Sequence, residues 1–143
     1  MARCVTSRAV DHEGEVLESF VTKERDKAAA LTFIKKALKR HGRAKAILTE
    51  GLRSYGAALD ELGAMGRQET GRWLNNRVEN SHLPFRRRER ATARFRRMKT
   101  LQKFSSVHAS VHNHFSQERH LVSREMYKER RSAALAEWRA VMA

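Results

Sequence analysis

The sequence predicts an α/β fold in which a β-hairpin, a helix and a short strand are followed by further helices. Two apolar runs flank a turn signal near the N-terminus, and a segment with helical apolar spacing follows them. A short apolar run without helical spacing then separates two helical segments. The 143 residues, 41% of them hydrophobic, are enough for one domain with a core of its own.

The first expected element is the hairpin, with strands over residues 5–10 and 16–22. The turn between them reads Asp-His-Glu-Gly, and its glycine adopts positive φ without steric cost. A helix should follow, with Asp26 as N-cap and Gly42 at its end. Its apolar residues recur at helical spacing: Ala30, Phe33, Ile34, Ala37 and Leu38.

The middle of the chain contains a short strand and two helices. Residues 46–49 follow a basic loop and are expected to form a buried strand. A second helix carries apolar residues from Tyr55 to Leu62, and a glycine-rich loop over residues 63–71 follows it. A third helix is expected to begin near Asn76, and Pro84 should kink or divide it.

Two more helices are expected in the C-terminal part. The apolar positions of the fourth helix are Leu101, Phe104, His108, Val111 and Phe115. Ser123 should cap the fifth helix, which carries Tyr127, Leu135, Trp138 and Met142 on one face. Both Trp73 and Trp138 are expected in the core.

The charge of the chain favours a polyanionic partner. Lys and Arg number 30 against 16 Asp and Glu, which gives a net charge of +14 and a pI of about 11.0. Such a field attracts nucleic acid, although a merely solvated basic surface is the alternative. The single Cys4 indicates a reducing compartment, and we find neither a signal peptide nor a membrane span. We therefore expect a cytoplasmic protein with no membrane partner.

Two carboxylates occupy positions typical of a metal-dependent enzyme that cuts and joins DNA. Glu50 ends the strand expected at residues 46–49, and Glu79 lies near the start of the third helix. Carboxylates from separate elements can hold two divalent ions about 3.5–4 Å apart. For Glu79 the alternative is a capping box with Asn76, and for Glu50 it is an ordinary solvated side chain at a strand end.

A dense cationic stretch follows Glu79 and is the expected DNA-binding surface. Such side chains bind phosphates and give affinity but little sequence information. The alternative is a solvated helix face. Phe85 and Phe95 within it are more typical of a core than of base stacking. The expected DNA-binding residues are Arg86, Arg87, Arg88, Arg90, Arg94, Arg96, Arg97 and Lys99.

Three histidines, His108, His112 and His114, resemble a metal cluster because two of them share a helix face. However, His108 and His112 lie among apolar residues, and neither a cysteine nor an HExxH pattern accompanies them. Packed, hydrogen-bonded histidines are the better interpretation.

The sequence resembles the DDE transposases of bacterial insertion sequences, specifically the insertion-sequence-six family. The resemblance extends from about Arg8 to the C-terminus, and residues 1–7 do not match. It implies an RNase H-like fold that lacks its first strand, with residues 8–118 as a partial catalytic core and 119–143 as a C-terminal helix. The segments that carry the resemblance are residues 8–18, 25–29, 51–55, 75–82, 86–90 and 107–113.

The resemblance also implies roles for particular residues. Glu79 matches the third catalytic carboxylate, and Glu50 matches the second, where the family has Asp. The strand with the first Asp has no counterpart in this sequence, and the turn with Asp11 is expected at the wrong end of the sheet to replace it. The family implies Mg²⁺ or Mn²⁺ as cofactor, with Glu50 and Glu79 as ligands, and DNA as partner.

We therefore expect a mobile-element protein of DNA transposition, recombination and integration that is catalytically defective on its own. One alternative is a non-catalytic DNA-binding regulator or a dimerisation partner of a full-length transposase. Another is a basic helical RNA-binding protein. Without the first strand, two strand edges lose their shared neighbour, so we expect marginal stability or pairing with another copy.

Overall fold

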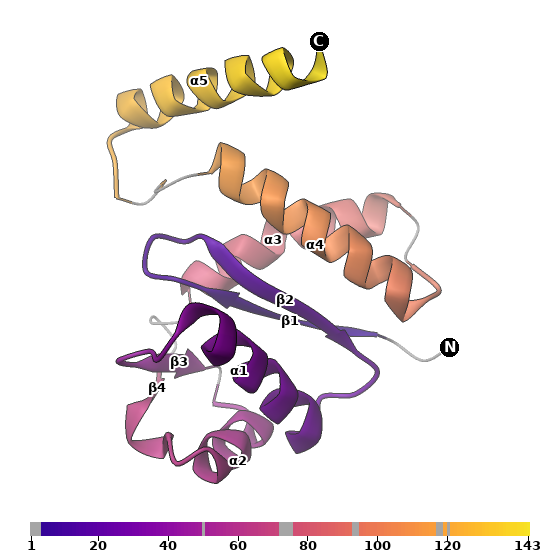
Figure 1. Cartoon of the computed structure of the whole chain (residues 1–143), viewed down its shortest axis with the longest axis vertical. Helices are drawn as coiled ribbons and strands as arrows, with labels where there is room; N and C mark the ends of the chain where they lie inside the picture. The colour runs from indigo at the N-terminus through magenta and orange to yellow at the C-terminus, as the bar shows by residue number, and fades with distance from the viewer. Residues whose placement is uncertain (1–3, 50, 72–75, 93–94, 117–118, 120) are drawn as a thin grey trace.

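The computed structural model describes residues 4–49, 51–71, 76–92, 95–116, 119 and 121–143. It has the expected α/β architecture with a helical C-terminal tail (Figure 1). The elements in chain order are β1 (Val5–Val10), β2 (Val16–Thr22), α1 (Lys27–His41), β3 (Ile47–Thr49), α2 (Arg53–Glu61), the 3-10 helix η1 (Met65–Arg67), β4 (Gln68–Thr70), α3 (Asn76–Ala91), α4 (Met98–Phe115) and α5 (Arg124–Met142).

The N-terminal hairpin is confirmed. Strands β1 and β2 are antiparallel, with Arg8 opposite Ser19. The turn is closed by Asp11, whose Oδ1 accepts the backbone N–H groups of Glu13 and Glu15, both at 2.9 Å. Gly14 has a φ of 85°, which a residue with a Cβ adopts only with strain.

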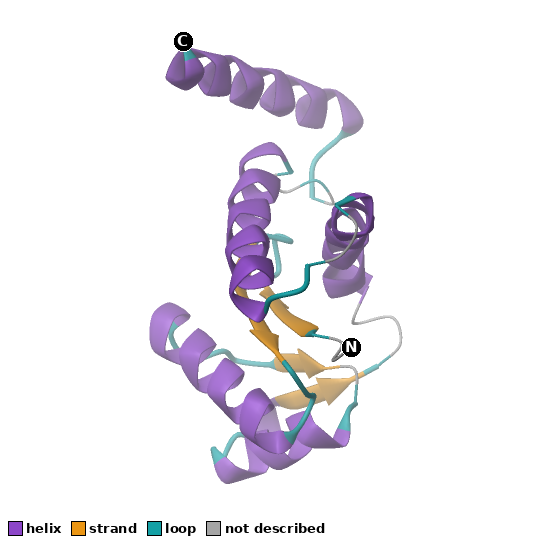
Figure 2. Cartoon of the chain, turned by 90° about the vertical axis from the view of Figure 1, so that its right-hand side faces the viewer, coloured by secondary structure: helices purple, strands orange, loops and turns teal. Residues whose placement is uncertain are grey.

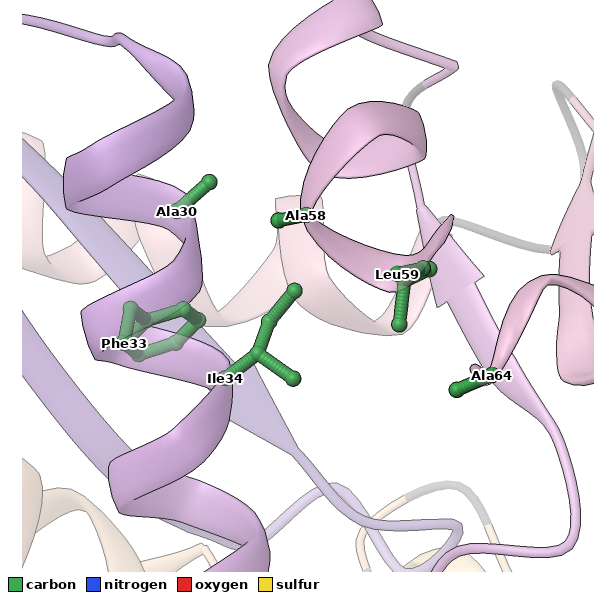
Figure 3. Packing of buried hydrophobic residues seen from close by; sticks show 6 residues of the cluster. All are labelled: Ala30, Phe33, Ile34, Ala58, Leu59 and Ala64. Atoms are coloured by element: carbon green, nitrogen blue, oxygen red, sulfur yellow. The ribbon is translucent and has the colours of Figure 1, made fainter. Parts of the chain in front are cut away.

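Helices α1 and α2 pack against each other below the hairpin in Figure 1 and form the larger core. Asp26 caps α1 as expected, since its Oδ1 accepts the N–H of Ala29 at 2.7 Å. Gly42 ends α1 with a φ of 83°. Figure 3 shows the six buried residues of this core: Ala30, Phe33, Ile34, Ala58, Leu59 and Ala64.

The third strand is shorter and less buried than expected. It begins at Ile47 rather than at residue 46, and Leu48 is exposed. It pairs in parallel with β4, which lies in the segment expected to be a loop, residues 63–71. The sequence of β4, Gln-Glu-Thr, has no apolar alternation, so no strand signal was present there.

Helices α3 and α4 pack on the other side of the hairpin, where they bury Phe85 and Leu101 beside Val21. Phe85 is fully buried, which confirms the expected core role, and Phe95 packs against Phe104 with ring centroids 4.8 Å apart. Pro84 lies inside α3, but the helix runs unbroken through it, so division at Pro84 was a wrong alternative.

Helix α5 lies at the edge of the molecule (Figure 1). Ser123 caps it as expected, with Oγ 3.3 Å from the N–H of Met126. Its apolar face is mostly uncovered, and Trp138 is 42% exposed, so the expectation of a core Trp138 was wrong. The reason is that α5 meets α4 along a narrow line, where Trp138 touches only the rings of His114 and Phe115 among aromatic partners described. Trp73 lies outside the described residues.

The strands form two separate sheets. Within the described residues, β1 pairs only with β2, and β3 pairs only with β4. This arrangement agrees with an incomplete RNase H-like fold, in which one strand would join the two pairs. Among the described helices, none is both long and apolar enough to cross a membrane.

Candidate functional site

Glu79 lies in the first turn of α3 and is exposed to solvent. A carboxylate there interacts favourably with the partial positive charge at the start of the helix. Because α3 already includes Asn76, Asn76 lies within the helix and not at the N-cap position that the alternative of a capping box with Glu79 requires. The position of Glu79 leaves its carboxylate accessible to a ligand.

Glu50 lies outside the described residues, and the strand before it, β3, ends at Thr49. Thr49 is buried, and its Oγ1 accepts a hydrogen bond from Gln68 Nε2 at 2.9 Å and from the N–H of Gly51 at 3.3 Å. Gly51 has a φ of 74°, so the chain turns sharply just after position 50. Whether Glu50 and Glu79 approach each other stays a prediction.

Acidic oxygens gather instead at the hairpin turn, which sequence reasoning had not singled out as a cluster. Asp11, Glu13 and Glu15 each offer an oxygen, and these lie within 4.8 Å of one another. One oxygen of Asp11 is already held by two backbone N–H groups, and Glu15 accepts a 3.4 Å hydrogen bond from Asn113. These contacts explain the gathering of the three acidic side chains as a feature of the hairpin turn.

The paired metal ions that the family implies would need ligands beyond Glu79, the proposed ligand that the structure describes. Two such ions need several carboxylates from separate elements. In the described part of the chain, Glu79 is the one family-matched carboxylate present. No catalytic step is therefore assigned to these residues.

The cationic row covers the second half of α3 and the start of α4. Arg86 is half-buried, and Arg94 lies outside the described residues. The other members are exposed, and no salt bridge engages them within the described chain: Arg87, Arg88, Arg90, Arg96, Arg97 and Lys99. Unpaired exposed cations remain available to bind phosphate. Arg88 and Arg90 lie in the last turn of α3, where the partial negative charge at the C-terminal end of the helix interacts favourably with cations.

A buried arginine, Arg8, lies beneath α3 and was missed as a functional candidate. It is only 5% exposed, and its Nη1 donates a 2.7 Å hydrogen bond to the carbonyl of Ser81. The guanidinium lies over the ring of Phe85, 5.1 Å from the centroid. Its Nε and Nη2 have no hydrogen-bond partner among the described residues. Burial lowers the pKa of Arg8 to about 10, so the group remains charged at neutral pH.

The histidines near Arg8 are neutral at pH 7. Burial, followed by the charge of Arg8, lowers the pKa of both His82 and His108 to about 4. The same two causes lower the pKa of His112. His108 packs edge-on against Phe85 at 5.4 Å, as expected of a core histidine. The hydrogen bond expected for His108 is absent at Nδ1, which is buried without a partner among the described residues.

His114 does make the expected kind of contact, since its Nε2 lies 2.9 Å from the carbonyl oxygen of Ala134 on α5. In the described part of the chain, none of the three histidines takes part in a cluster that could hold a metal ion. The interpretation of these residues as packing residues therefore fits their positions better than a metal site.

Comparison with known proteins identifies the family. A family described as "DDE domain" matches residues 4–118. A Staphylococcus aureus protein named "Transposase for insertion sequence-like element IS431mec" is 30% identical over 80 residues, which cover 52% of this chain and 36% of that protein. The same values hold for "Transposase for insertion sequence element IS257 in transposon Tn4003" from Staphylococcus aureus.

The chain thus spans about a third of the length of these relatives, 36%. No solved structure matches it significantly. The family match covers most of the chain, from the hairpin to the end of α4, and includes Glu79 and the cationic row. The chain belongs to the DDE transposases of the insertion-sequence-six family.

Proposed function

We propose that this polypeptide serves DNA transposition by binding DNA through the cationic row and that it supplies no strand cleavage or transfer by itself. The observation that carries the proposal is the row of exposed, unpaired cations that begins at Arg87, two residues after the buried Phe85, and runs into α4. Membership of a transposase family supports DNA as the polyanion, in preference to RNA. Family members use Mg²⁺ or Mn²⁺, with Glu50 and Glu79 as the proposed ligands here.

The geometry of α3 supports a link between DNA binding and the carboxylate of Glu79. Arg86 lies seven residues after Glu79 on the same helix. Seven residues correspond to two turns, so the two side chains leave nearly the same face about 10 Å apart along the axis. A phosphate held near Arg86 would therefore lie along the helix from Glu79. We propose residues 8–118 as the partial core that carries this surface and 119–143 as a separate helical tail.

The lack of chemistry follows from the carboxylates. Glu50 has one methylene more than the Asp of the family, and this displaces the carboxylate by about 1 Å, whereas metal sites tolerate about 0.2 Å. Asp11, the remaining candidate near a strand end, is held in the hairpin turn by two N–H groups. Two carboxylates, one of them displaced, are too few for a two-metal site.

A second candidate function is that of a non-catalytic partner, either for another copy of this chain or for a full-length transposase. The specific observation in its favour is the pair of two-stranded sheets, since each leaves a strand edge without a strand beside it in the described chain. A protein of this kind would regulate transposition by occupying DNA or by joining a longer transposase.

Binding of fluorescent duplex DNA at increasing salt concentration tests the proposal. The triple substitution R87Q/R88Q/R90Q should weaken binding strongly and reduce the slope of log K against log salt by about 2–3, since each phosphate contact contributes about 0.9. The control K35Q/K39Q/R43Q removes the same charge from the opposite side of the hairpin, on α1 and just after it. Equal losses in the two triple variants would mean that general charge, and not this row, binds DNA.

A further inference from the structure

Helix α5 has an exposed stripe of side chains outside both the family match and the cationic row. The match ends at residue 118, and α5 begins at Arg124. In Figure 1 and Figure 2, α5 lies beyond the end of α4 at the edge of the molecule, and α4 is its main neighbour among the described elements. Residues at alternating spacings of four and three share one side of a helix, and here they form the α5 stripe, all exposed: Arg124, Lys128, Arg131, Leu135, Trp138 and Met142.

The first half of the α5 stripe is cationic. Arg124, Lys128 and Arg131 make no salt bridge within the described chain, and none of the three acids of α5 belongs to the stripe. The seven residues from Arg124 to Arg131 rise by about 10 Å along the helix axis. A nucleic-acid strand places about two or three phosphates over this length. This half of the stripe therefore suits the backbone of a polyanion.

The second half of the α5 stripe presents an aromatic ring that is held in place. Trp138 packs against the rings of His114 and Phe115, with centroids 6.0 and 5.9 Å apart. Close by, the contact of His114 Nε2 with the carbonyl oxygen of Ala134, at 2.9 Å, joins α5 to α4. Trp138 is nevertheless 42% exposed. Proteins that bind single-stranded nucleic acid stack bases on accessible aromatic rings of this kind.

The order of charges along the α5 stripe argues against a second copy of α5 as its occupant. Parallel pairing of two such helices would place each cation opposite its own counterpart, and facing like charges repel. Antiparallel pairing would bury the cations against Leu135, Trp138 and Met142, where they would lack a compensating charge. The occupant should therefore be anionic along one half of the stripe and flat and apolar along the other.

We propose that the α5 stripe binds single-stranded DNA, with phosphates at Arg124, Lys128 and Arg131 and an unpaired base stacked on Trp138. The net charge of +14 and membership of a transposase family support DNA as the ligand. A duplex keeps the faces of its bases inside the stack, so only an unpaired base can reach the indole ring. Because every base has a flat π-face, the site distinguishes single from double strands and tolerates any sequence.

Comparison of two oligonucleotides tests the stacking step without any variant. The probe is a fluorescent oligothymidylate of about twelve nucleotides, and the matched control is an abasic oligonucleotide of the same length and charge. Fluorescence anisotropy should give an affinity about tenfold higher for the oligothymidylate, since stacking contributes only where a base is present. Equal binding of the two oligonucleotides by the unsubstituted protein would overturn the proposal.

Variants separate the two halves of the α5 stripe. Trp138→Ala should lower the affinity for oligothymidylate about tenfold and leave the slope of log K against log salt unchanged, because stacking releases no counterions. Trp138→Phe should retain most of the affinity. R124Q/K128Q/R131Q should instead reduce the slope by about 2, since each contact with a single-strand phosphate contributes about 0.7.

Met126→Ala is the matched control for Trp138→Ala, because Met126 is 46% exposed on the same helix and lies outside the α5 stripe. It should bind oligothymidylate as the unsubstituted protein does. Equal losses in Met126→Ala and Trp138→Ala would refute Trp138 as the stacking residue. A dimer in analytical ultracentrifugation that Trp138→Ala dissociates, with no effect of this substitution on oligothymidylate binding, would replace DNA by a second copy as the occupant.

The α5 stripe and the cationic row fail separately. Trp138→Ala should leave the binding of duplex DNA unchanged, whereas R87Q/R88Q/R90Q should retain the preference for oligothymidylate over the abasic oligonucleotide. Loss of duplex binding in R87Q/R88Q/R90Q alone would support the cationic row whatever the result for the α5 stripe. Duplex binding by the row without any base preference would overturn only the proposal for the α5 stripe.

Discussion

Arg8 illustrates at the residue scale what a sequence cannot reveal by itself. The alternation of β1 shows which residues share a face, but the partner of the face that carries Arg8 is α3, more than seventy residues later in the chain. The lowered pKa of His82 also depends on a contact between distant segments, since burial and then the charge of Arg8 are its main causes. By contrast, the roles of Asp26 and Ser123 as helix caps were predictable, because a cap and its helix are neighbours in sequence.

The two half-buried histidines, His82 and His108, should make stability depend on pH. The pKa of His82 and His108 is about 4 in the folded protein and close to 6.5 when unfolded, so between these values the unfolded state binds more protons. The free energy of unfolding should therefore fall as pH decreases from about 6.5 to about 4, and the loss should be complete below that range. Urea denaturation at several pH values measures this fall in the free energy of unfolding.

The double substitution H82Q/H108Q should flatten this pH dependence. His12→Gln is the matched control, because the His12 side chain is 79% exposed and lies in the hairpin turn. An unchanged slope between pH 4 and 6.5 in the double variant would mean that other groups, and not these histidines, link stability to protons.

At the scale of elements, local signals predicted the hairpin, α1 and the caps, whereas long-range contacts decided the rest. β4 was missed because Gln-Glu-Thr becomes a strand only by pairing with β3. The exposure of α5 was missed because its apolar spacing says nothing about whether another element covers it. Pro84 did not break α3, whose neighbouring Phe85 is fully buried against the hairpin and α4.

The coverage of β2 by α4 gives a prediction at this scale. Gln102→Ala removes the hydrogen bonds that its side chain makes with the N–H of Val21 and the carbonyl of Ser19, and it leaves that N–H unpaired, so we expect a loss of about 1–3 kcal/mol in the free energy of unfolding. Lys103→Ala, the next residue and an exposed one, should change it by less than about 0.5 kcal/mol. Urea denaturation of both variants tests the claim, and equal stabilities would contradict it.

For the whole molecule, family, fold class and the cationic row could be predicted from sequence, since they rest on specific segments and on clustered charge. The candidate catalytic site could be predicted only as a pair of positions. Glu79 is described as an exposed side chain on α3, whereas Glu50 lies outside the described residues. The separation of the strands into two sheets agrees with the expected loss of a shared neighbour strand.

The central claim is that this polypeptide binds DNA without cutting or joining it. The most direct measurement is an assay of strand cleavage and joining on labelled DNA that carries insertion-sequence ends, with Mg²⁺ or Mn²⁺, for the unsubstituted protein and for Glu79→Ala. The account predicts a salt-sensitive complex and no cleaved or joined product with either protein. Product formed by the unsubstituted protein and abolished by Glu79→Ala would contradict it and would mean that a complete set of metal ligands is assembled.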